Sequence, residues 1–151
     1  MSFSRVKNAI PIGGQTDLVF DTHPLNLIDT NIAIMLRDGD SASEAAVADL
    51  GLPPVLSLVT HVELEGGVHR DPSTAALRRI LLDSLLTKLR VLELTEADVR
   101  AYGAIVAAAG FDRRRILDRL IAAQCLTRNA TLITRNPRDF RDIDGLQLIE
   151  W

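Results

Sequence analysis

From residue 25 onward, short apolar runs alternate with longer amphipathic stretches. The runs are rich in leucine, isoleucine and valine and lie at 25–28, 55–59, 91–94, 131–134 and 146–149. Each is apolar at consecutive positions, which is typical of strands buried on both faces of a parallel sheet. The stretches between them repeat apolar residues at helical spacing, most clearly at 77–89. This alternation predicts an α/β fold, a three-layer α/β/α sandwich with a mainly parallel five-stranded sheet.

Helix boundaries follow from capping residues and glycines. Ser41 or Ser43 is expected to cap the second helix, and Thr95-x-x-Asp98 opens a later one as a capping box. Glycine or proline stands near several of the expected helix ends. The predicted helices cover 32–37, 44–50, 60–68, about 73–89, 96–109 and 114–127.

The first 24 residues have a different pattern. They contain prolines and glycines, with one short apolar run at 17–21. We interpret 1–24 as an N-terminal extension, either an extra edge strand or a loosely held segment, and 25–151 as the domain. Asp21-Thr22 resembles Asp29-Thr30, but Pro24 follows it, and a residue before proline is biased away from helix. Asp21 is therefore the weaker candidate for a site.

Composition places the chain among single-domain globular proteins. It has 151 residues, of which 47% are hydrophobic and 25% charged. Its one cysteine, Cys125, allows no internal disulfide and is interpreted as a small buried hydrophobe. No apolar run approaches the roughly 20 residues of a membrane span, and the start lacks the apolar core of a signal peptide. We expect a cytoplasmic protein that does not bind membranes.

Four carboxylates stand where predicted strands end or helices begin. Asp29 ends the first strand, and Glu63 lies in the first turn after the second. Asp118 lies near the start of the helix before the fourth strand, and Asp139 follows that strand. If the first and fourth strands are neighbours, these ends meet in one crevice. Alternatively, each acid caps its own helix or interacts with the positive end of that helix's dipole. Thr60-x-x-Glu63 has the pattern of a capping box.

Clustered carboxylates repel one another unless a cation neutralises them. Hard oxygen ligands suit Mg²⁺ or Mn²⁺, which can activate water and stabilise displacement at phosphorus. In this hypothesis Asp29, Asp118 and Asp139 bind the metal, and Glu63 binds it through water or orients the attacking water. Short polar residues at the same rim would hold water or orient the acids, unless they only cap helices; these are Thr30, Asn31, Thr134 and Asn136.

Charge is distributed unevenly along the chain. The formal net charge is −3, but residues 111–141 hold eight arginines and three aspartates, a local balance of +5. Arginine binds phosphate bidentately, so this quarter is a candidate RNA-contact face, unless it is an ordinary solvated surface. The candidates are Arg113, Arg114, Arg115, Arg135 and Arg138.

Four blocks of residues, in this order, carry a resemblance to a known family. They are Ile28-Asp-Thr-Asn31, Thr60-x-x-Glu63-Leu64-x-x-Gly67, Asp118-x-x-Ile121-Ala-Ala123 and Thr134-Arg-Asn-x-x-Asp139-Phe140. From about residue 25 to 151 the chain resembles the PIN-domain ribonucleases, and within them the VapC-type toxins of type II toxin–antitoxin systems.

The resemblance implies a PIN-like fold and Mg²⁺- or Mn²⁺-dependent endonuclease action on RNA, with Asp29, Glu63, Asp118 and Asp139 as the acidic set. It also implies a homodimer and inhibition by a small VapB-like antitoxin whose tail enters the active site. The chain departs from the family in residues 1–24 and in Arg119, where an apolar residue is more usual.

Other functions are less consistent with the residues. His61-Val-Glu63 has the H-x-E pattern of zinc deaminases, which also need two downstream cysteines that the chain lacks. A receiver domain would need a lysine late in the chain, and none follows Lys88. Two alternatives stay open: a non-catalytic PIN-like interaction module, and an RNA- or DNA-processing nuclease outside a toxin–antitoxin pair.

Overall fold

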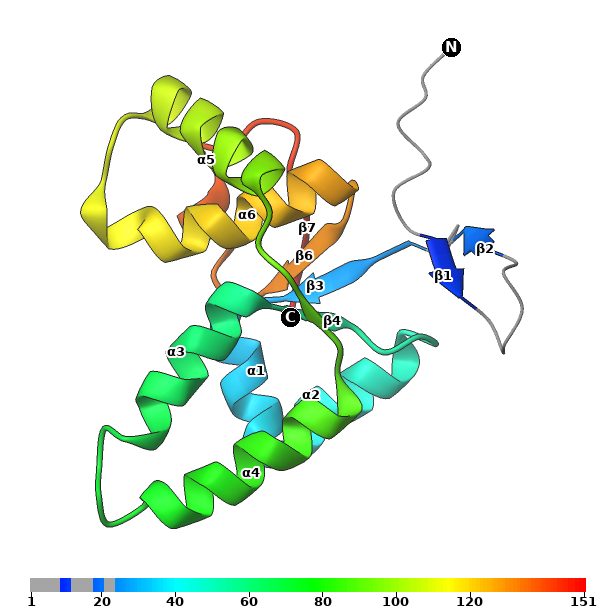
Figure 1. Cartoon of the computed structure of the whole chain (residues 1–151), viewed down its shortest axis with the longest axis vertical. Coiled ribbons are helices and arrows are strands. Elements are labelled where there is room, and N and C mark those ends of the chain that lie inside the picture. The colour runs from blue at the N-terminus through cyan, green and yellow to red at the C-terminus, as the bar shows by residue number, and fades with distance from the viewer. Residues whose placement is uncertain (1–8, 12–17, 21–23) are drawn as a thin grey trace.

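A computed structural model describes residues 9–11, 18–20 and 24–151, and in these ranges five parallel strands form the central sheet. Their order is β5-β4-β3-β6-β7 (Figure 1). The predicted mainly parallel five-stranded sheet is confirmed. The strands are β3 (Asn26–Ile28), β4 (Val55–Ser57), β5 (Val91–Leu92), β6 (Thr131–Thr134) and β7 (Gln147–Glu150).

The order of the strands reverses at β3. The chain adds β4 and β5 on one side of β3, then returns to place β6 and β7 on the other side. Leu27 of β3 is in register with Val55 of β4 and with Leu132 of β6. The carboxyl ends of β3 and β6 therefore lie side by side at a switch point, where open α/β sheets bind their ligands.

Helices cover both faces of the sheet, which confirms the predicted three layers. In Figure 1, α1 to α4 lie on one face, and α5 and α6 lie on the other. One short 3₁₀ turn precedes α6, and another follows β6. The bounds are α1 (Thr30–Arg37), α2 (Ser41–Asp49), α3 (Leu58–Val68), α4 (Ala75–Lys88), α5 (Glu96–Ala109), η1 (Arg113–Arg115), α6 (Ile116–Arg128) and η2 (Pro137–Phe140).

The central strand explains why its sequence is continuously apolar. Leu27 and Ile28 are both 0% exposed, yet they belong to two different cores. Leu27 packs in the cluster that includes Ile121 of α6, and Ile28 packs in the cluster that includes Leu64 of α3. Successive side chains of a strand point to opposite faces, so both faces of β3 are buried.

Two predicted helix starts are wrong. Ser57 caps α3 and accepts a hydrogen bond from the Val59 amide at 3.0 Å, so Thr60 and Glu63 lie inside the helix and form no capping box. Asp40, rather than Ser41 or Ser43, caps α2 and accepts from the Ser43 amide at 2.8 Å. In both cases a good capping residue nearer the preceding segment starts the helix earlier.

The box of Thr95 and Asp98 is confirmed at the start of α5.

The segment before residue 24 contributes two described strands. β1 (Ala9–Pro11) and β2 (Leu18–Phe20) pair antiparallel in a separate sheet. The apolar run at 17–21 thus contains a strand, but β2 is no edge strand of the central sheet. Asp21 lies outside the described residues, and the boundary at residue 24 stays a prediction. Among the described residues, no helix combines the length and apolar composition that crossing a bilayer requires.

Candidate active site

Asp29 occupies the turn between β3 and α1 and is 5% exposed. Its Oδ1 accepts a hydrogen bond from the Ile32 amide at 3.0 Å, which makes it the N-cap of α1. Its Oδ2 accepts a hydrogen bond from Thr134 Oγ1 at the end of β6, at 2.5 Å. Asp29 is therefore both a helix cap and a member of the switch-point crevice, so the two interpretations of this residue are compatible.

Glu63 is held from α1 by a relay of hydroxyls. Thr30 Oγ1 donates to Glu63 Oε1 at 3.0 Å and lies 3.1 Å from Thr60 Oγ1. A hydroxyl has a single hydrogen, so when Thr30 donates to Glu63, Thr60 donates to Thr30. Sequence reasoning missed Thr60 as part of the site. The signal was present, since Thr60 and Glu63 share a face of one helix three residues apart.

Asp118 and Asp139 border a shared opening. Asp118 lies in the first turn of α6, and Asp139 lies in η2, just after β6. Together with Arg114 and Arg115 they line a pocket of about 290 Å³. Arg115 Nη1 donates to the backbone carbonyl of Asp139 at 2.9 Å, which ties the start of α6 to η2.

Burial and neighbouring charges raise the pKa values of Asp29, Glu63 and Asp118. Burial raises the pKa of Asp29, and the negative charge of Asp139 adds to the effect, while hydrogen bonds from Thr134 and backbone amides oppose it. Burial also raises the pKa of Glu63, with further contributions from Asp118 and Asp29. Burial raises the pKa of Asp118, reinforced by Asp139 and Asp29 and opposed by Arg115. Four acids from four elements thus share one electrostatic environment.

The donor set fits a hard divalent cation by its chemistry, because carboxylates and hydroxyls are the ligands of Mg²⁺ and Mn²⁺. A cation would also relieve the mutual repulsion that raises these pKa values. In the described part of the chain, no group of three or more aspartate, glutamate, histidine or cysteine residues is arranged to hold a metal ion. Mg²⁺ typically keeps several waters and needs only one or two carboxylates together with substrate phosphates, so this open arrangement is compatible with it.

The remaining polar candidates have distinct environments. Thr134 is fully buried, and besides donating to Asp29 it accepts from the Asn136 amide at 3.0 Å. Asn31 and Asn136 are exposed at the rim. The backbone amide of Asn31 also contributes a hydrogen bond to Asp29. Thr134 therefore orients Asp29, whereas the two asparagine side chains are open to solvent.

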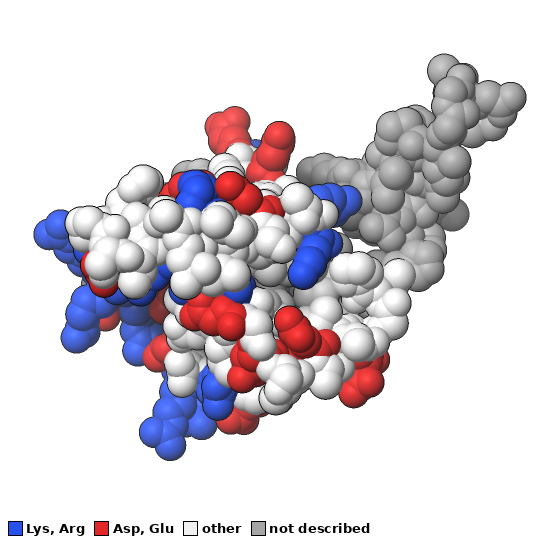
Figure 2. Space-filling model, turned by 90° about the horizontal axis from the view of Figure 1, so that it is seen from below, with Lys and Arg blue, Asp and Glu red and all other residues white. Residues whose placement is uncertain are grey.

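The predicted arginine face is divided by the fold. Figure 2 shows basic side chains gathered along one side of the molecule, the side on which the α5–α6 connection lies in Figure 1. Arg113, Arg114 and Arg138 are exposed, and Arg114 pairs with Asp112 at 3.1 Å. Arg135 reaches α1 instead, where its Nη1 lies 3.1 Å from Met35 Sδ.

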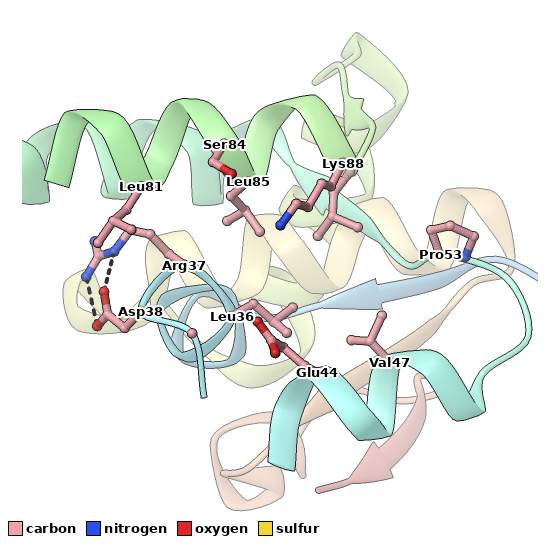
Figure 3. Close-up of a pocket in the computed structure, with 12 residues that line it drawn as sticks. Leu36, Arg37, Asp38, Glu44, Val47, Pro53, Leu81, Ser84, Leu85 and Lys88 are labelled. Atoms are coloured by element: carbon pink, nitrogen blue, oxygen red, sulfur yellow. Dashed lines mark hydrogen bonds and ion pairs between the residues drawn. The ribbon is translucent and has the colours of Figure 1, made fainter. Parts of the chain in front are cut away.

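A larger groove lies between α1, α2 and α4 and has a volume of about 580 Å³ (Figure 3). Leu36, Val47 and Leu85 supply apolar lining, and Arg37 pairs with Asp38 at one end. It shares no lining residue with the acidic pocket. Its lining contains two acids, of which Asp38 pairs with Arg37, so it lacks the clustered carboxylates of the acidic site.

Comparison with known proteins gives one matching family model. The model of the PIN domain family matches residues 27–146. Among curated proteins, no significant match was found.

Several solved structures are similar to the chain. One is VapBC-1 from nontypeable Haemophilus influenzae, with 27% identity, a TM-score of 0.69, and coverage of 84% of this chain and 98% of that one. Another is FitAcB from Neisseria gonorrhoeae, with 26% identity, a TM-score of 0.68, and coverage of 83% and 97%. VapBC2 from Rickettsia felis, bound to a DNA fragment from its promoter, has a TM-score of 0.74 over 84% and 98% of the two chains; at 23% identity it supports the fold alone.

Proposed function

This chain belongs to the PIN-domain family, and from that premise we propose that it is a metal-dependent endoribonuclease acting as the toxin of a toxin–antitoxin pair. The observation that carries the proposal is that the acids converge where β3 and β6 end: Asp29 is bonded to Thr134 of β6, Thr30 of α1 holds Glu63, and Asp118 and Asp139 line one pocket. Burial and neighbouring acids raise the pKa values of Asp29, Glu63 and Asp118. Carboxylates that destabilise one another are expected where a site is preorganised for a cation.

In the proposed site, Asp29, Asp118 and Asp139 would hold Mg²⁺ or Mn²⁺. The bound ion would supply a Lewis acid that lowers the pKa of water and neutralises charge developing at phosphorus. Thr134 keeps the Asp29 carboxylate in one orientation and favours its charged form. Arg114 and Arg115, which line the pocket beside Asp118, would bind the RNA backbone.

Glu63 is the proposed group that orients the attacking water. Thr30 donates to Oε1, so the position of the carboxylate is fixed from α1, and Oε2 is left to accept a proton from the water. In the metal-free protein, burial raises the pKa of Glu63, and the negative charges of Asp118 and Asp29 add to the effect.

The proposed assembly is a homodimer inhibited by a small VapB-like antitoxin. Support comes from the solved structures similar to this chain, which include VapBC-1 of Haemophilus influenzae and FitAcB of Neisseria gonorrhoeae. Co-expression with the product of a short neighbouring gene tests this part. A stable complex that abolishes cleavage is expected; a toxin active in the presence of every neighbouring product would point to a processing nuclease outside such a pair.

The function itself is tested by cleavage of a panel of structured RNAs, with single-stranded DNA as a comparison substrate. We expect RNA cleavage that needs Mg²⁺ or Mn²⁺ and stops with EDTA. The double variant Asp29→Asn/Asp118→Asn should be inactive, while Asp144→Asn, an exposed aspartate outside the site, should cleave normally. Undiminished cleavage by the double variant contradicts the mechanism.

One observation favours the second candidate, a non-catalytic interaction module: no group of three acidic or other metal-ligating residues among those described is arranged to hold a metal. Calorimetry with Mn²⁺ separates the two functions. Binding at micromolar to low millimolar Mn²⁺ supports the nuclease, and no binding in that range supports the module.

A further inference from the structure

Arg119 is a buried arginine that joins three segments of the chain. It directly follows Asp118 on α6, and its side chain is 3% exposed. Its Nη1 donates to the backbone carbonyl of Gly110, at the end of α5, at 2.5 Å. Its Nη2 donates to Asp142 Oδ2, in the loop after η2, at 3.0 Å. Arg119 thus connects the helix that carries Asp118 to the segment that carries Asp139.

The segment from 139 to 142 is held at one end by α6 and at the other by the residue that precedes it. Arg115, the N-cap residue of α6, lies one turn before Arg119 and donates to the carbonyl of Asp139 at 2.9 Å. Phe140, between the two attachments, is 2% exposed and packs in the core that contains Ile121 of α6. The two arginines lie on either side of Asp118 in sequence, so the same contacts that hold this segment also fix Asp118 relative to Asp139.

Stability alone is a poor explanation for this arrangement. The Arg119 side chain is 3% exposed but its partner Asp142 is 41% exposed, so burial of the guanidinium costs desolvation that a pair with a solvated carboxylate only partly offsets. Arg119 Nε is also buried with no hydrogen-bond partner among the described residues, and an unsatisfied buried donor is costly. The contacts of Arg119 do, however, fix the distance between α6 and the segment that follows η2.

We propose that Arg119, acting through Asp142, is a positioning residue that fixes Asp139 relative to Asp118 and thereby sets the affinity of the acidic site for a divalent cation. The inference rests on the proposed metal-dependent function. Among the described residues, Arg119 donates its hydrogen bonds to Gly110 and Asp142 and not to the four site carboxylates, and it does not line the pocket, so its role is indirect.

The test is Mn²⁺ binding by calorimetry, together with thermal unfolding, on the full chain with Arg119→Met. Arg128→Met is the matched control: Arg128 lies at the other end of α6 and pairs with the buried Asp98 at 2.7 Å. Both variants should unfold at lower temperature. Arg119→Met should weaken Mn²⁺ binding about tenfold, a typical effect of losing an outer-shell partner, whereas Arg128→Met should bind Mn²⁺ like the wild type.

Equal Mn²⁺ affinity in Arg119→Met and wild type overturns the inference, and so does an equal loss in Arg128→Met. If Arg119→Met does not fold, Arg119→Lys and Asp142→Asn decide: a few-fold weaker binding in both supports the positioning role, and unchanged binding in both overturns it. A wild type that neither binds Mn²⁺ nor cleaves RNA would instead refute the proposed function, on which the inference depends.

Discussion

Thr134 Oγ1 and Asp29 Oδ2, from residues 105 positions apart, are joined by a hydrogen bond of 2.5 Å in the buried crevice between β3 and β6. This bond opposes the effect of burial on Asp29, whose pKa is nevertheless raised. The hydroxyl of Thr134 therefore helps to keep a buried carboxylate ionised, and its removal has a predictable direction.

Thr134→Val should lower cleavage at neutral pH. The substitution keeps the shape of the side chain but removes the hydrogen bond that lowers the pKa of Asp29. The pKa of Asp29 should rise further, so the acid limb of the pH–rate profile should move to higher pH. A hydrogen bond to a charged group is worth about 1.5–3 kcal/mol, which corresponds to roughly tenfold or more in rate. Thr131→Val, on the same strand but bonded to Gln147 at 3.3 Å near the surface, is the control and should cleave normally. An acid limb at the same pH in Thr134→Val and wild type would contradict the role of Thr134 in keeping Asp29 ionised.

Asp118→Asn should stabilise the metal-free protein at alkaline pH. Burial, then Asp139 and Asp29, raise the folded-state pKa of Asp118. A carboxyl with a raised folded pKa binds its proton more tightly in the folded state, so stability falls as pH rises from about 4 through the folded pKa. At pH 8 without metal the variant should therefore melt a few degrees above wild type, and near pH 4 the difference should vanish.

The variant Asp118→Asn also tests whether Asp118 binds the metal. Mn²⁺ should raise the melting temperature of the wild type at pH 8, since a ligand that binds only the folded state stabilises it. The gain should be small in Asp118→Asn and normal in Asp144→Asn, which alters an exposed aspartate. A full gain in Asp118→Asn would remove Asp118 from the set of proposed ligands.

Asp98→Asn should destabilise the protein without affecting the site. Asp98 is 0% exposed and accepts hydrogen bonds from the Thr95 amide, Thr127 Oγ1 and Arg128 Nη1. Burial acts to raise its pKa, but these bonds outweigh burial and the net pKa is lowered. The stability that this carboxylate contributes is thus present above the unfolded pKa of about 4 and is lost as pH falls through the folded value.

Breaking a buried pair typically costs about 3–5 kcal/mol, which urea unfolding at pH 7 would measure. The difference between Asp98→Asn and wild type should shrink at pH 3. Asp83→Asn is the control: Asp83 pairs with Arg79 on the surface of α4, and an exposed pair is worth at most about 1 kcal/mol. Mn²⁺ affinity should be unchanged in both variants.

Arg113→Ala/Arg114→Ala should weaken RNA binding and reduce its salt dependence. Both arginines are exposed on η1, and Arg114 lines the acidic pocket. Each lost phosphate contact should lower the slope of log affinity against log salt by about 0.7 for single-stranded RNA. Arg100→Ala is the control, an exposed arginine on α5 paired with Glu96. Equal slopes for the double variant and the wild type would show that η1 does not contact RNA.

The strands and the family were the most predictable features of the molecule. Leu27 and Ile28 are apolar at consecutive positions because each faces a different core, and that pattern is visible in the sequence. The PIN-domain assignment is confirmed by the match over residues 27–146. The condition under which the acids are expected to meet, that the first and fourth predicted strands are neighbours, is fulfilled by the pairing of β3 with β6.

Other features depend on three-dimensional contacts that local patterns do not contain. Ser57 and Thr60 are both good capping residues, and only the end of β4 decides that Ser57 begins α3. Arginine is rarely fully buried, so the residue type predicts an exposed side chain at position 119, although an apolar residue is more usual there in the family. Its partner Asp142 lies 23 residues away, and no periodicity links the two. The site roles of the four acids remain predictions for the experiments above.

The position of β6 beside β3 has a consequence for protein synthesis. β3, the first strand of the central sheet to be synthesised, lies in the middle of that sheet, and its partner on one side, β6, is the next-to-last strand of the sheet in the sequence. Parallel pairing between distant segments forms late in folding. Asp29 therefore meets Thr134 and Asp139 only after nearly the whole domain has left the ribosome and β6 has docked. A nascent or truncated chain would lack a complete acidic site. The cell that synthesises the chain would therefore be exposed to the proposed nuclease activity only after the domain has folded.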